Sequence, residues 1–459
     1  MDAYLFIDFG STFTKLTLVD IVNEEIIATE KSYTTVDTDV TIGYNSALER
    51  LNKKVKTEYN IVKKLACSSA AGGLKIIAIG LVPELTAEAA KRAALGAGAK
   101  VIKTYSFNLN NDELLEIKNS NADMILLAGG TNGGNSECIL HNAQQIKNHK
   151  LTIPVVVGGN KSSIDEIKRI FGEDIEHYIT ENVMPDLNHI NVEPARETIR
   201  NIFMKKIIHA KGMENVQDTI SGILMPTPAS VLKAAEVLSV GTKDEDGIGD
   251  LAVIDIGGAT TDIHSIAEGA PSKPSVVLRG LEEPHSKRTV EGDLGMRYSA
   301  MSVFDAAGMK YMRKYLHSTF DIEAEFRKRS EETSFVAETD IEIEFDEAIA
   351  KVCADISMKR HAGIVEPIYS PMGMMYSQTG KDLMDLPYVL GTGGVIVNSK
   401  DPDKIMEASL FTMEDPTSLK PRHPKFLLDK MYILSAMGLL AMINPNMAVR
   451  MLKKYIVEI

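Results

Sequence analysis

Two segments of the chain share one pattern of residue types that suits phosphate and metal chemistry. Residues 7–16 and residues 254–263 each run from an apolar strand through an Asp and a Gly-rich turn with hydroxyls into a second strand. The backbone N–H groups of such a turn can bind phosphate oxygens, glycine permits close approach, and Ser or Thr adds donors. The Asp oxygens suit Mg²⁺, which is usually held through waters. Two such hairpins facing each other would bind a polyphosphate from both sides.

The residue types divide the expected roles. Asp8 and Asp255 end the incoming strands and are the candidate metal-binding carboxylates, whereas Asp262 lies at the far end of the second turn. Capping of the turn through an Asx hydrogen bond is the alternative interpretation of Asp8 and Asp255. The expected phosphate donors are Gly10, Ser11, Thr12, Gly257, Gly258, Thr260 and Thr261.

A third element, residues 389–396, is another apolar strand that runs into Gly391, Gly393 and Gly394. With this element the chain resembles the ASKHA superfamily of actin, the seventy-kilodalton heat-shock chaperones and the sugar kinases. In that superfamily the three motifs, in this order, are phosphate-1, phosphate-2 and the adenosine motif. Three unrelated Gly turns remain the alternative.

The resemblance implies an α/β fold with two ribonuclease-H-like lobes and ATP between them. Asp8 and Asp255 would hold Mg²⁺ and orient a water on the γ-phosphate, and Asp262 would stand where some members keep another catalytic carboxylate. The three glycines of the adenosine motif would let the backbone lie against adenosine. Lys15 lies on the outgoing strand, where alternation of faces predicts that its side chain points to solvent.

Length and composition set the class of protein. The 459 residues exceed what one core supports and predict two to four domains. A net charge of −13 argues against nucleic-acid binding and against adhesion to anionic membranes. Cys67, Cys138 and Cys353 are too dispersed for a disulfide framework, and we expect a cytoplasmic protein without a membrane span. The chain has no GxxxxGK[ST] motif and no HExxH motif.

The first half of the chain shows two different patterns of predicted strands and helices. Residues 1–71 read as a first lobe, with strands at 4–9, 13–20 and 25–33 followed by an amphipathic helix over 43–59. Strands and helices then alternate over 72–185, which predicts an inserted α/β module with a parallel sheet covered on both faces. Thr86 is expected to be the N-cap of a helix over 86–95, and the glycine loop 129–134 could hold an anion or a second protein, or be a plain turn.

The second half contains the other lobe. Residues 186–248 read as helical, with a candidate connect-1 helix over 229–238, and 249–459 form lobe 2. Acidic residues 318–350 predict a solvated helix and loop, and 401–424 a loop-rich stretch. A helix over 427–443 carries small residues on one face. In ASKHA proteins the helix in this place is connect-2, which packs closely on connect-1. Scattered histidines are expected to be surface or core residues, namely His141, His189, His209, His264 and His285.

Three segments narrow the resemblance across nearly the whole length: residues 67–73, 127–134 and 182–196. They are similar to the glutamate mutase accessory proteins of glutamate-fermenting anaerobes, also called methylaspartate mutase reactivating factors. The resemblance implies a chaperone-like, Mg²⁺-dependent ATPase. Such a factor binds an adenosylcobalamin-dependent mutase, uses nucleotide-driven lobe closure to release damaged cobalamin, and touches the mutase through the inserted module.

Three other functions share the ASKHA core. A small-molecule kinase would need a substrate pocket between the lobes. An activator of dehydratases would need paired cysteines for a bridging iron–sulfur cluster, and three dispersed cysteines disfavour it. An actin-like filament protein is the alternative among interaction proteins.

Overall fold

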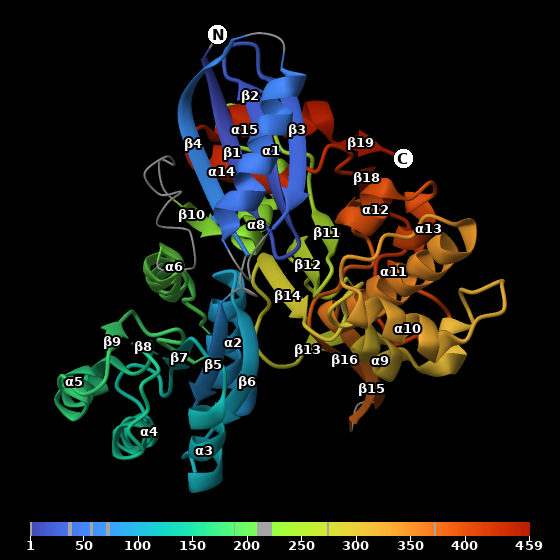
Figure 1. Ribbon diagram of the computed structural model, residues 1–459. Coiled ribbons are helices and arrows are strands. Elements are labelled where there is room, and N and C mark those ends of the chain that lie inside the picture. Colours follow the sequence, from blue (N-terminus) through green and yellow to red (C-terminus); the bar gives the residue numbers. More distant parts are fainter. Residues whose placement is uncertain are drawn as a thin grey trace.

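The computed structural model describes residues 2–34, 39–55, 58–69, 74–187, 189–208, 223–272, 275–370 and 373–459. Residues 70–73, Asn188 and His209, which enter the sequence arguments, lie outside the described residues. Two lobes lie on either side of a pair of crossing helices, and an α/β module packs beside the first lobe (Figure 1).

Lobe 1 contains a five-stranded sheet in the order β10-β4-β1-β2-β3. The first three strands of the chain pair antiparallel, β4 pairs in parallel with β1, and β10 pairs in parallel with β4. The three N-terminal strands are as predicted, the helix begins and ends earlier than predicted, and β10 was not predicted. The elements are β1 (Asp2–Phe9), β2 (Phe13–Asp20), β3 (Glu25–Tyr33), α1 (Val40–Lys54), β4 (Asn60–Ser68) and β10 (Ile223–Pro226).

Lobe 2 repeats this arrangement in the sheet β14-β12-β11-β17-β18-β19. Again three strands are antiparallel and two follow in parallel. The repeated order is that of two ribonuclease-H-like lobes, so the actin-like ATPase fold predicted from the three motifs is confirmed. The strands are β11 (Leu251–Ile256), β12 (Thr261–Ile266), β14 (Ser286–Glu291), β17 (Tyr388–Thr392), β18 (Lys425–Leu428) and β19 (Val457–Glu458).

Helices α8 (Thr227–Val240) and α14 (Leu434–Ala441) cross between the two sheets and share one apolar core with both. The crossing is close because Gly438 has no side chain: a Cβ there would lie 1.8 Å from the carbonyl oxygen of Ser230. Ser230 Oγ also donates to the Ser435 carbonyl oxygen at 2.6 Å. The predicted packing of the two helices is therefore confirmed. The predicted start of the second helix at residue 427 was wrong, because residues 425–428 form β18.

The inserted module contains an all-parallel sheet in the order β6-β5-β7-β8-β9, as predicted. Thr86, however, is no N-cap. It lies in a short π-helical turn, η2 (Pro83–Ala87), where its Oγ1 accepts from the N–H groups of Leu81 and Val82. The other elements are β5 (Lys75–Gly80), α2 (Glu88–Gly96), β6 (Lys100–Ser106), α3 (Asn111–Asn119), β7 (Met124–Leu127), α4 (Glu137–Asn148), β8 (Val155–Val157), η3 (Lys161–Ser163), α5 (Ile164–Phe171) and β9 (His177–Ile179).

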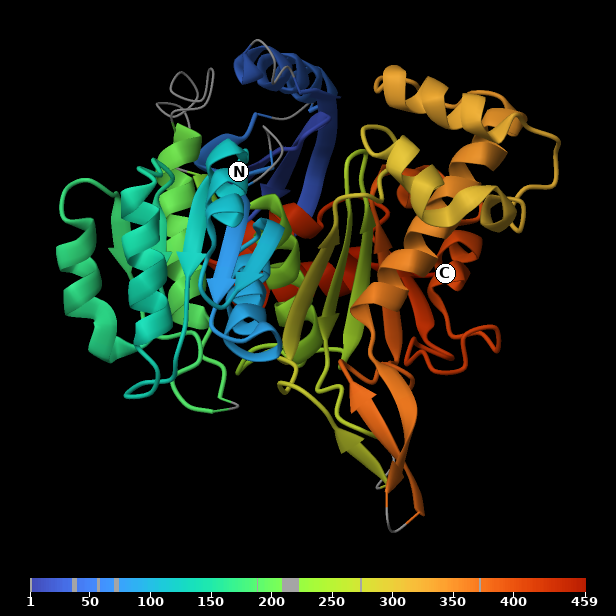
Figure 2. The same ribbon diagram turned by 90° about the horizontal axis from the view of Figure 1, so that it is seen from below.

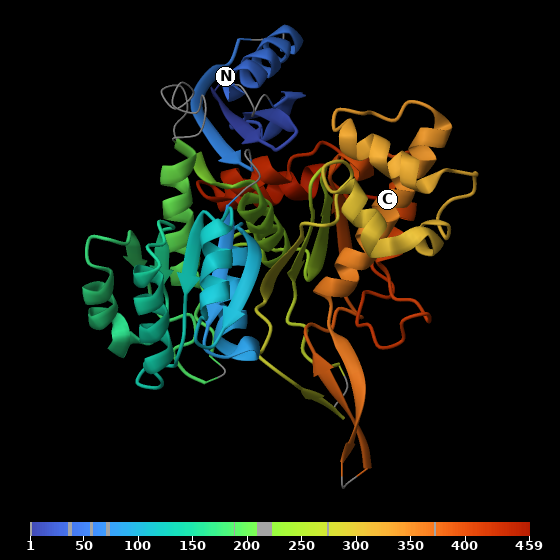
Figure 3. The same cartoon turned by 60° about the horizontal axis from the view of Figure 1, so that its bottom comes forward.

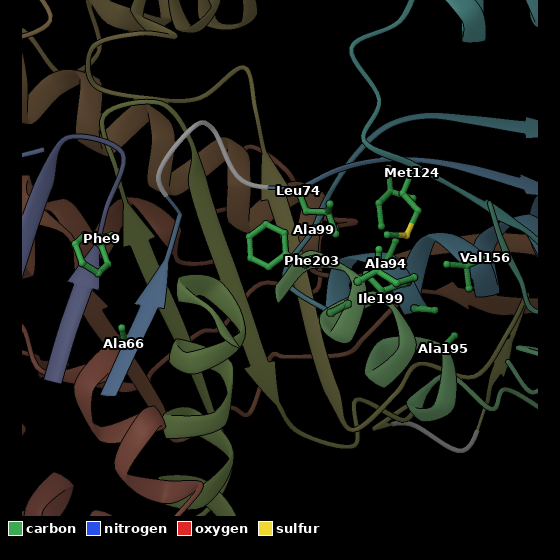
Figure 4. Packing of buried hydrophobic residues seen from close by; sticks show 14 of the residues in the cluster. Phe9, Ala66, Leu74, Ala94, Ala99, Met124, Val156, Ala195, Ile199 and Phe203 are labelled. Atoms are coloured by element: carbon green, nitrogen blue, oxygen red, sulfur yellow. The ribbon is translucent and has the colours of Figure 1, made fainter. Parts of the chain in front are cut away.

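The module shares a hydrophobic core with lobe 1. One cluster of buried residues runs from Phe9 and Ala66 in the lobe 1 sheet, through Phe203 of α6 (Glu193–Ile208), to Met124 and Val156 in the module sheet (Figure 4). The two parts are therefore packed as neighbours in one core, and removing the module would expose apolar side chains of lobe 1.

Lobe 2 departs from expectation in two places. The acidic stretch 318–350 was predicted to be solvated, but Phe326 and Phe345 are buried in it and the fully buried Arg329 pairs with Asp346 at 2.6 Å. A projecting sheet of β13 (Val276–Leu278), β15 (Ile364–Ser370) and β16 (Gly373–Thr379) was not predicted (Figures 2 and 3). The helices of this lobe are α9 (Ala300–Met312), α10 (Ile322–Glu331), α11 (Asp340–His361), α12 (Gly394–Asn398), α13 (Pro402–Met406), η4 (Glu407–Ser409) and α15 (Pro445–Tyr455).

Candidate functional site

A cleft of about 1130 Å³ lies between the lobes, and both Gly turns line it. The inserted module also reaches it through Gly98 and Lys100. The predicted site residues that line the cleft are Asp8, Gly10, Ser11, Thr12, Asp255, Gly257, Gly258, Thr260, Asp262 and Gly394.

The two Gly turns face each other across this cleft. Each is closed by one backbone hydrogen bond, from Gly10 N to the Phe13 carbonyl at 3.1 Å and from Gly257 N to the Thr260 carbonyl at 2.9 Å. A Cβ on Gly258 would lie 3.2 Å from Thr12 Oγ1. The repeated pattern in the sequence therefore does correspond to two opposed turns, and Thr12 of one and Thr260 of the other line the cleft.

Three of the expected contact residues lie away from the cleft. Thr261 is fully buried, and its hydroxyl donates to the Leu294 carbonyl at 2.9 Å. A Cβ on Gly391 would lie 2.6 Å from Met406 Sδ, so this glycine serves strand packing. Gly393 has φ +95° and sits against the Ile256 backbone, with only 2.4 Å between its Cβ position and that carbonyl oxygen. Of the adenosine motif glycines, Gly394 is the one that lines the cleft.

Asp8 lies within a network of donors at the ends of both crossing helices. Its Oδ1 accepts from Thr227 Oγ1 at 2.6 Å and from Cys67 Sγ at 3.5 Å. Its Oδ2 accepts from Ser435 Oγ at 3.3 Å and from Lys15 Nζ at 3.4 Å. Thr227 begins α8 and Ser435 lies in α14, so this carboxylate joins the first Gly turn to both helices.

The prediction that Lys15 points to solvent was wrong. Its side chain points into the cleft, where Nζ lies 3.4 Å from Asp8 Oδ2 and 3.5 Å from the centroid of the Tyr432 ring. Burial alone would lower the pKa of Lys15, but Tyr432 and Asp8 together hold it above its usual value. Lys15 is thus a fixed cation on β2, beside Asp8 at the wall of the cleft.

Asp255 has a different environment, because its carboxylate makes no hydrogen bond or ion pair to the described residues. Burial raises the pKa of Asp255 to about 7, the nearby Asp262 raises it further, and Lys15 opposes the rise. A carboxylate with this pKa is only half ionised near neutral pH, and a cation placed beside it would favour the ionised form.

Asp262 is held by an arginine. Oδ1 accepts from Arg288 Nε at 2.8 Å and pairs with Nη2 at 2.6 Å, while Oδ2 accepts from Thr260 Oγ1 at 3.1 Å. Both partners of this ion pair are buried. Asp262 lines the cleft but is neutralised, so its geometry favours positioning of the second turn over metal binding.

Sequence reasoning missed three residues of this region: Thr227, Tyr432 and Asp429. Thr227 lies two residues ahead of the helix expected over 229–238, and its role as a partner of Asp8 was not predicted. Asp429 accepts from the N–H groups at the start of α14, Ile433 and Leu434, and from Thr392 Oγ1. An Asp ahead of an apolar run is an N-terminal signal, but the helix was expected to begin before it. Nothing in the sequence marks Tyr432.

Two other predictions have a clear outcome. All three cysteines are buried and free, as expected of reduced thiols. The loop 129–134 is cross-linked by asparagine side chains: Asn160 Nδ2 donates to the carbonyls of Gly134 and Asn135, and Asn182 Nδ2 to that of Gly130. The carbonyls of Gly130 and Gly134 and the N–H of Gly133 therefore have partners within the module, which favours the interpretation as a turn.

The residues present fit Mg²⁺ best when a phosphate completes its ligands. No group of three or more His, Cys, Asp or Glu side chains within the described part of the chain could hold a metal alone. Mg²⁺ in nucleotide sites commonly uses one or two carboxylates together with phosphates and waters. Asp255 is open for this role, whereas Asp8 is already surrounded by donors.

Comparison with known proteins decides the family. The chain matches the family described as MutL protein over residues 4–456. It is 62% identical over 462 residues to Protein MutL of Clostridium tetanomorphum, with 100% of both chains covered. The chain belongs to the MutL protein family.

Solved structures resemble this MutL-family chain only distantly. The activator of the 2-hydroxyisocaproyl-CoA dehydratase from Clostridium difficile with bound ADPNP is 12% identical with TM-score 0.34, covering 98% of this chain and 97% of that one. Xylulose kinase from Lactobacillus acidophilus is 12% identical with TM-score 0.35, covering 100% and 93%. The strand order of the two lobes, not these scores, identifies the fold. Among the described helices, none is both long and apolar enough to cross a membrane.

Proposed function

We propose that the protein binds and hydrolyses Mg²⁺–ATP in the cleft between its lobes. The observation that carries this proposal is the pair of opposed Gly turns, each preceded by an Asp on the same strand of an equivalent sheet. The hydroxyls of Thr12 and Thr260, which line the cleft, and the fixed cation Lys15 supply donors for a polyphosphate.

The two carboxylates take different parts in this proposal. Asp255 is the better metal carboxylate, since its oxygens are uncommitted and a cation would offset its burial. Asp8 holds Lys15 toward the phosphates and orients the attacking water through the same network. Thr12 and Thr260 donate from opposite sides, and Gly394 leaves room for the adenosine at the lobe 2 wall.

We further propose that ATP turnover serves an adenosylcobalamin-dependent mutase, with glutamate mutase as the first candidate. Membership of the MutL protein family supports this role, together with the similarity to mutase accessory proteins stated from residues 67–73, 127–134 and 182–196. In this role the protein binds a mutase that has lost its adenosyl group, and movement of its lobes releases the damaged cobalamin.

The contacts of Asp8 suggest how the cleft drives such a movement. The Asp8 carboxylate bonds to Thr227 of α8 and Ser435 of α14, and these two helices join the lobes. A γ-phosphate that draws Lys15 away from Asp8 leaves the Asp8 carboxylate without this counter-charge, at the starts of both α8 and α14. Two lobe arrangements that differ in this contact would then be biased by nucleotide state.

The test is restoration of inactivated mutase. Glutamate mutase holoenzyme is inactivated by turnover, incubated with the protein, Mg²⁺–ATP and fresh cofactor, and assayed for recovered activity. We expect recovery with the wild type, and none with Asp255→Asn. A mutase that stays inactive with the wild-type protein, although ATP is hydrolysed, contradicts the accessory role and leaves the ATPase proposal standing.

A further inference from the structure

Arg288 on β14 connects three parts of the molecule that are far apart in the sequence. Its Nε and Nη2 bind Asp262 beside the second Gly turn. Its Nη1 donates to the carbonyl oxygens of Leu95 and Ala99, each at 2.9 Å. Since the Arg288 side chain is only 3% exposed, these contacts are shielded from solvent and from salt.

Leu95 lies in the last turn of α2, and Ala99 lies in the short turn that leads from α2 to β6 in the inserted module. The carbonyl end of a helix carries partial negative charge, so a cation is well placed there. The same turn also packs against the start of α8: a Cβ on Gly98, at φ +92°, would be 2.8 Å from Cβ of Pro226, the residue before α8, and 3.3 Å from that of Ala229 within it. The turn 96–100 thus lies between lobe 2, the module and the first residues of α8.

On the cleft side, the chain of contacts begins at a phosphate-binding candidate. Thr260 lines the cleft, closes the second turn through its carbonyl, and donates its hydroxyl to Asp262 Oδ2. His264, opposite Arg288 in the β12–β14 pairing, is buried, and burial lowers its pKa to about 3. It is neutral at physiological pH, so Arg288 is the cation that Asp262 faces on these two strands.

We propose that Arg288 is a positioning residue that couples the second Gly turn to the inserted module through Thr260, Asp262 and the end of α2. This inference rests on the proposed nucleotide site. When a phosphate accepts the Thr260 hydroxyl, Asp262 Oδ2 is freed and can pair with the guanidinium side-on. The guanidinium then turns, and this alters the hydrogen bonds from its Nη1 to the Leu95 and Ala99 carbonyls. By linkage, the factor by which nucleotide changes the affinity of the module for a partner is also the factor by which that partner changes the affinity for nucleotide.

Arg92 provides a matched control. It also joins the module to lobe 2 from α2, with Nη1 donating to the Glu282 carbonyl at 2.8 Å and Nη2 pairing with Glu283 at 2.9 Å. Its side chain is 10% exposed, yet its partners in this network do not include a residue of either Gly turn. Replacing Arg92 weakens the docking of the module while leaving the contacts of Thr260, Asp262 and Arg288 in place.

The experiment is hydrogen–deuterium exchange of the backbone amides of residues 97–100, in the full chain, with and without Mg²⁺ and a non-hydrolysable ATP analogue. Arg288→Lys keeps a cation beside the buried Asp262 but removes the guanidinium, which bonds to Asp262 on one side and to the Leu95 and Ala99 carbonyls on the other. Thr260→Val removes the hydroxyl without changing charge, whereas Thr260→Ser keeps it. Nucleotide binding to each variant is measured separately by calorimetry, so that every comparison is made at saturation.

For the wild type we expect a change of at least threefold in the exchange rate of these amides on nucleotide binding. Arg288→Lys and Thr260→Val should lose this change, and Arg92→Lys and Thr260→Ser should keep it. A response of wild-type size in Arg288→Lys or Thr260→Val, or its loss in Arg92→Lys, overturns the coupling. A wild type that binds nucleotide without any change at residues 97–100 overturns it as well, whereas a wild type that binds no nucleotide overturns the proposed function.

Discussion

The two lobes share one strand order and place an Asp at the same point of the first strand, yet the two carboxylates have opposite environments. The residue beside Asp8 on the parallel strand is Cys67, which donates to it, whereas the residue beside Asp255 is Thr392, whose hydroxyl goes to Asp429 instead. The difference lies in which way one neighbouring side chain points, not in the motif itself.

The residue after the fifth strand strengthens this difference. In lobe 1 it is Thr227, a donor to Asp8, and in lobe 2 it is Asp429, a second carboxylate whose charge raises the pKa of Asp255 further. One repeated motif therefore yields a carboxylate fixed to the hinge helices and a carboxylate left to titrate. A shared motif fixes the position of a group, and its surroundings decide its chemistry.

The largest expected effect is on ATP turnover. Asp255→Asn removes the carboxylate best placed for Mg²⁺. Asp8→Asn removes the carboxylate that holds Lys15 and orients the attacking water. We expect each to lower kcat at least about 100-fold, since a lost electrostatic contact in the transition state costs several kcal/mol. Steady-state phosphate release measures this, and near-normal turnover in both variants would reduce these residues to turn capping.

The same two substitutions should differ in their effect on stability. The pKa of Asp255 is 3.8 in the unfolded chain and about 7 in the folded protein. Between these two pH values the folded protein keeps a proton on Asp255 that the unfolded chain has released. Stability from this group is present below about pH 4 and lost as pH rises through 7. Asp255→Asn should therefore raise the Tm at pH 8, whereas Asp8→Asn, which loosens Thr227 and Lys15, should lower the free energy of unfolding by about 2 kcal/mol. Equal destabilisation by both would remove the contrast between the lobes.

A smaller effect is expected at the link between Asp8 and the hinge. Thr227→Val keeps the shape of the side chain but removes the 2.6 Å hydrogen bond to Asp8. We expect a loss of about 1 kcal/mol in chemical denaturation. Thr227→Ser keeps the hydroxyl and should behave as the wild type. If Ser and Val variants are equally destabilised, packing at the start of α8, and not the hydrogen bond, is what matters.

The parts that the sequence predicted are those set by local pattern. The period of apolar residues placed β1, β2 and β3, the alternation of strands and helices gave the parallel module, and Gly with small residues at 435–441 indicated the close helix crossing. The facing of the two turns followed from the repeat, because two equivalent lobes present the same strand end to a common cleft.

The missed parts depend on side chains meeting across the fold. Lys15 was placed by strand alternation, which tells which face of a sheet it is on but not that Tyr432 and a cleft lie there. Likewise Arg288 has no motif, and its role appears only where β14 meets the end of α2. The acidic stretch 318–350 misled because Arg329 neutralises Asp346 inside the core.

The most direct measurement is calorimetric titration of the wild-type protein with Mg²⁺–ATP analogue between pH 6 and pH 8, in buffers of different ionisation enthalpy. If Asp255 binds the metal as a carboxylate, its proton must leave, so affinity should fall about tenfold from pH 8 to pH 6 and protons should be released on binding below pH 7. Asp255→Asn should abolish both effects. Absence of binding, or binding with the same affinity at both pH values and no proton release, would contradict a nucleotide site built around this carboxylate.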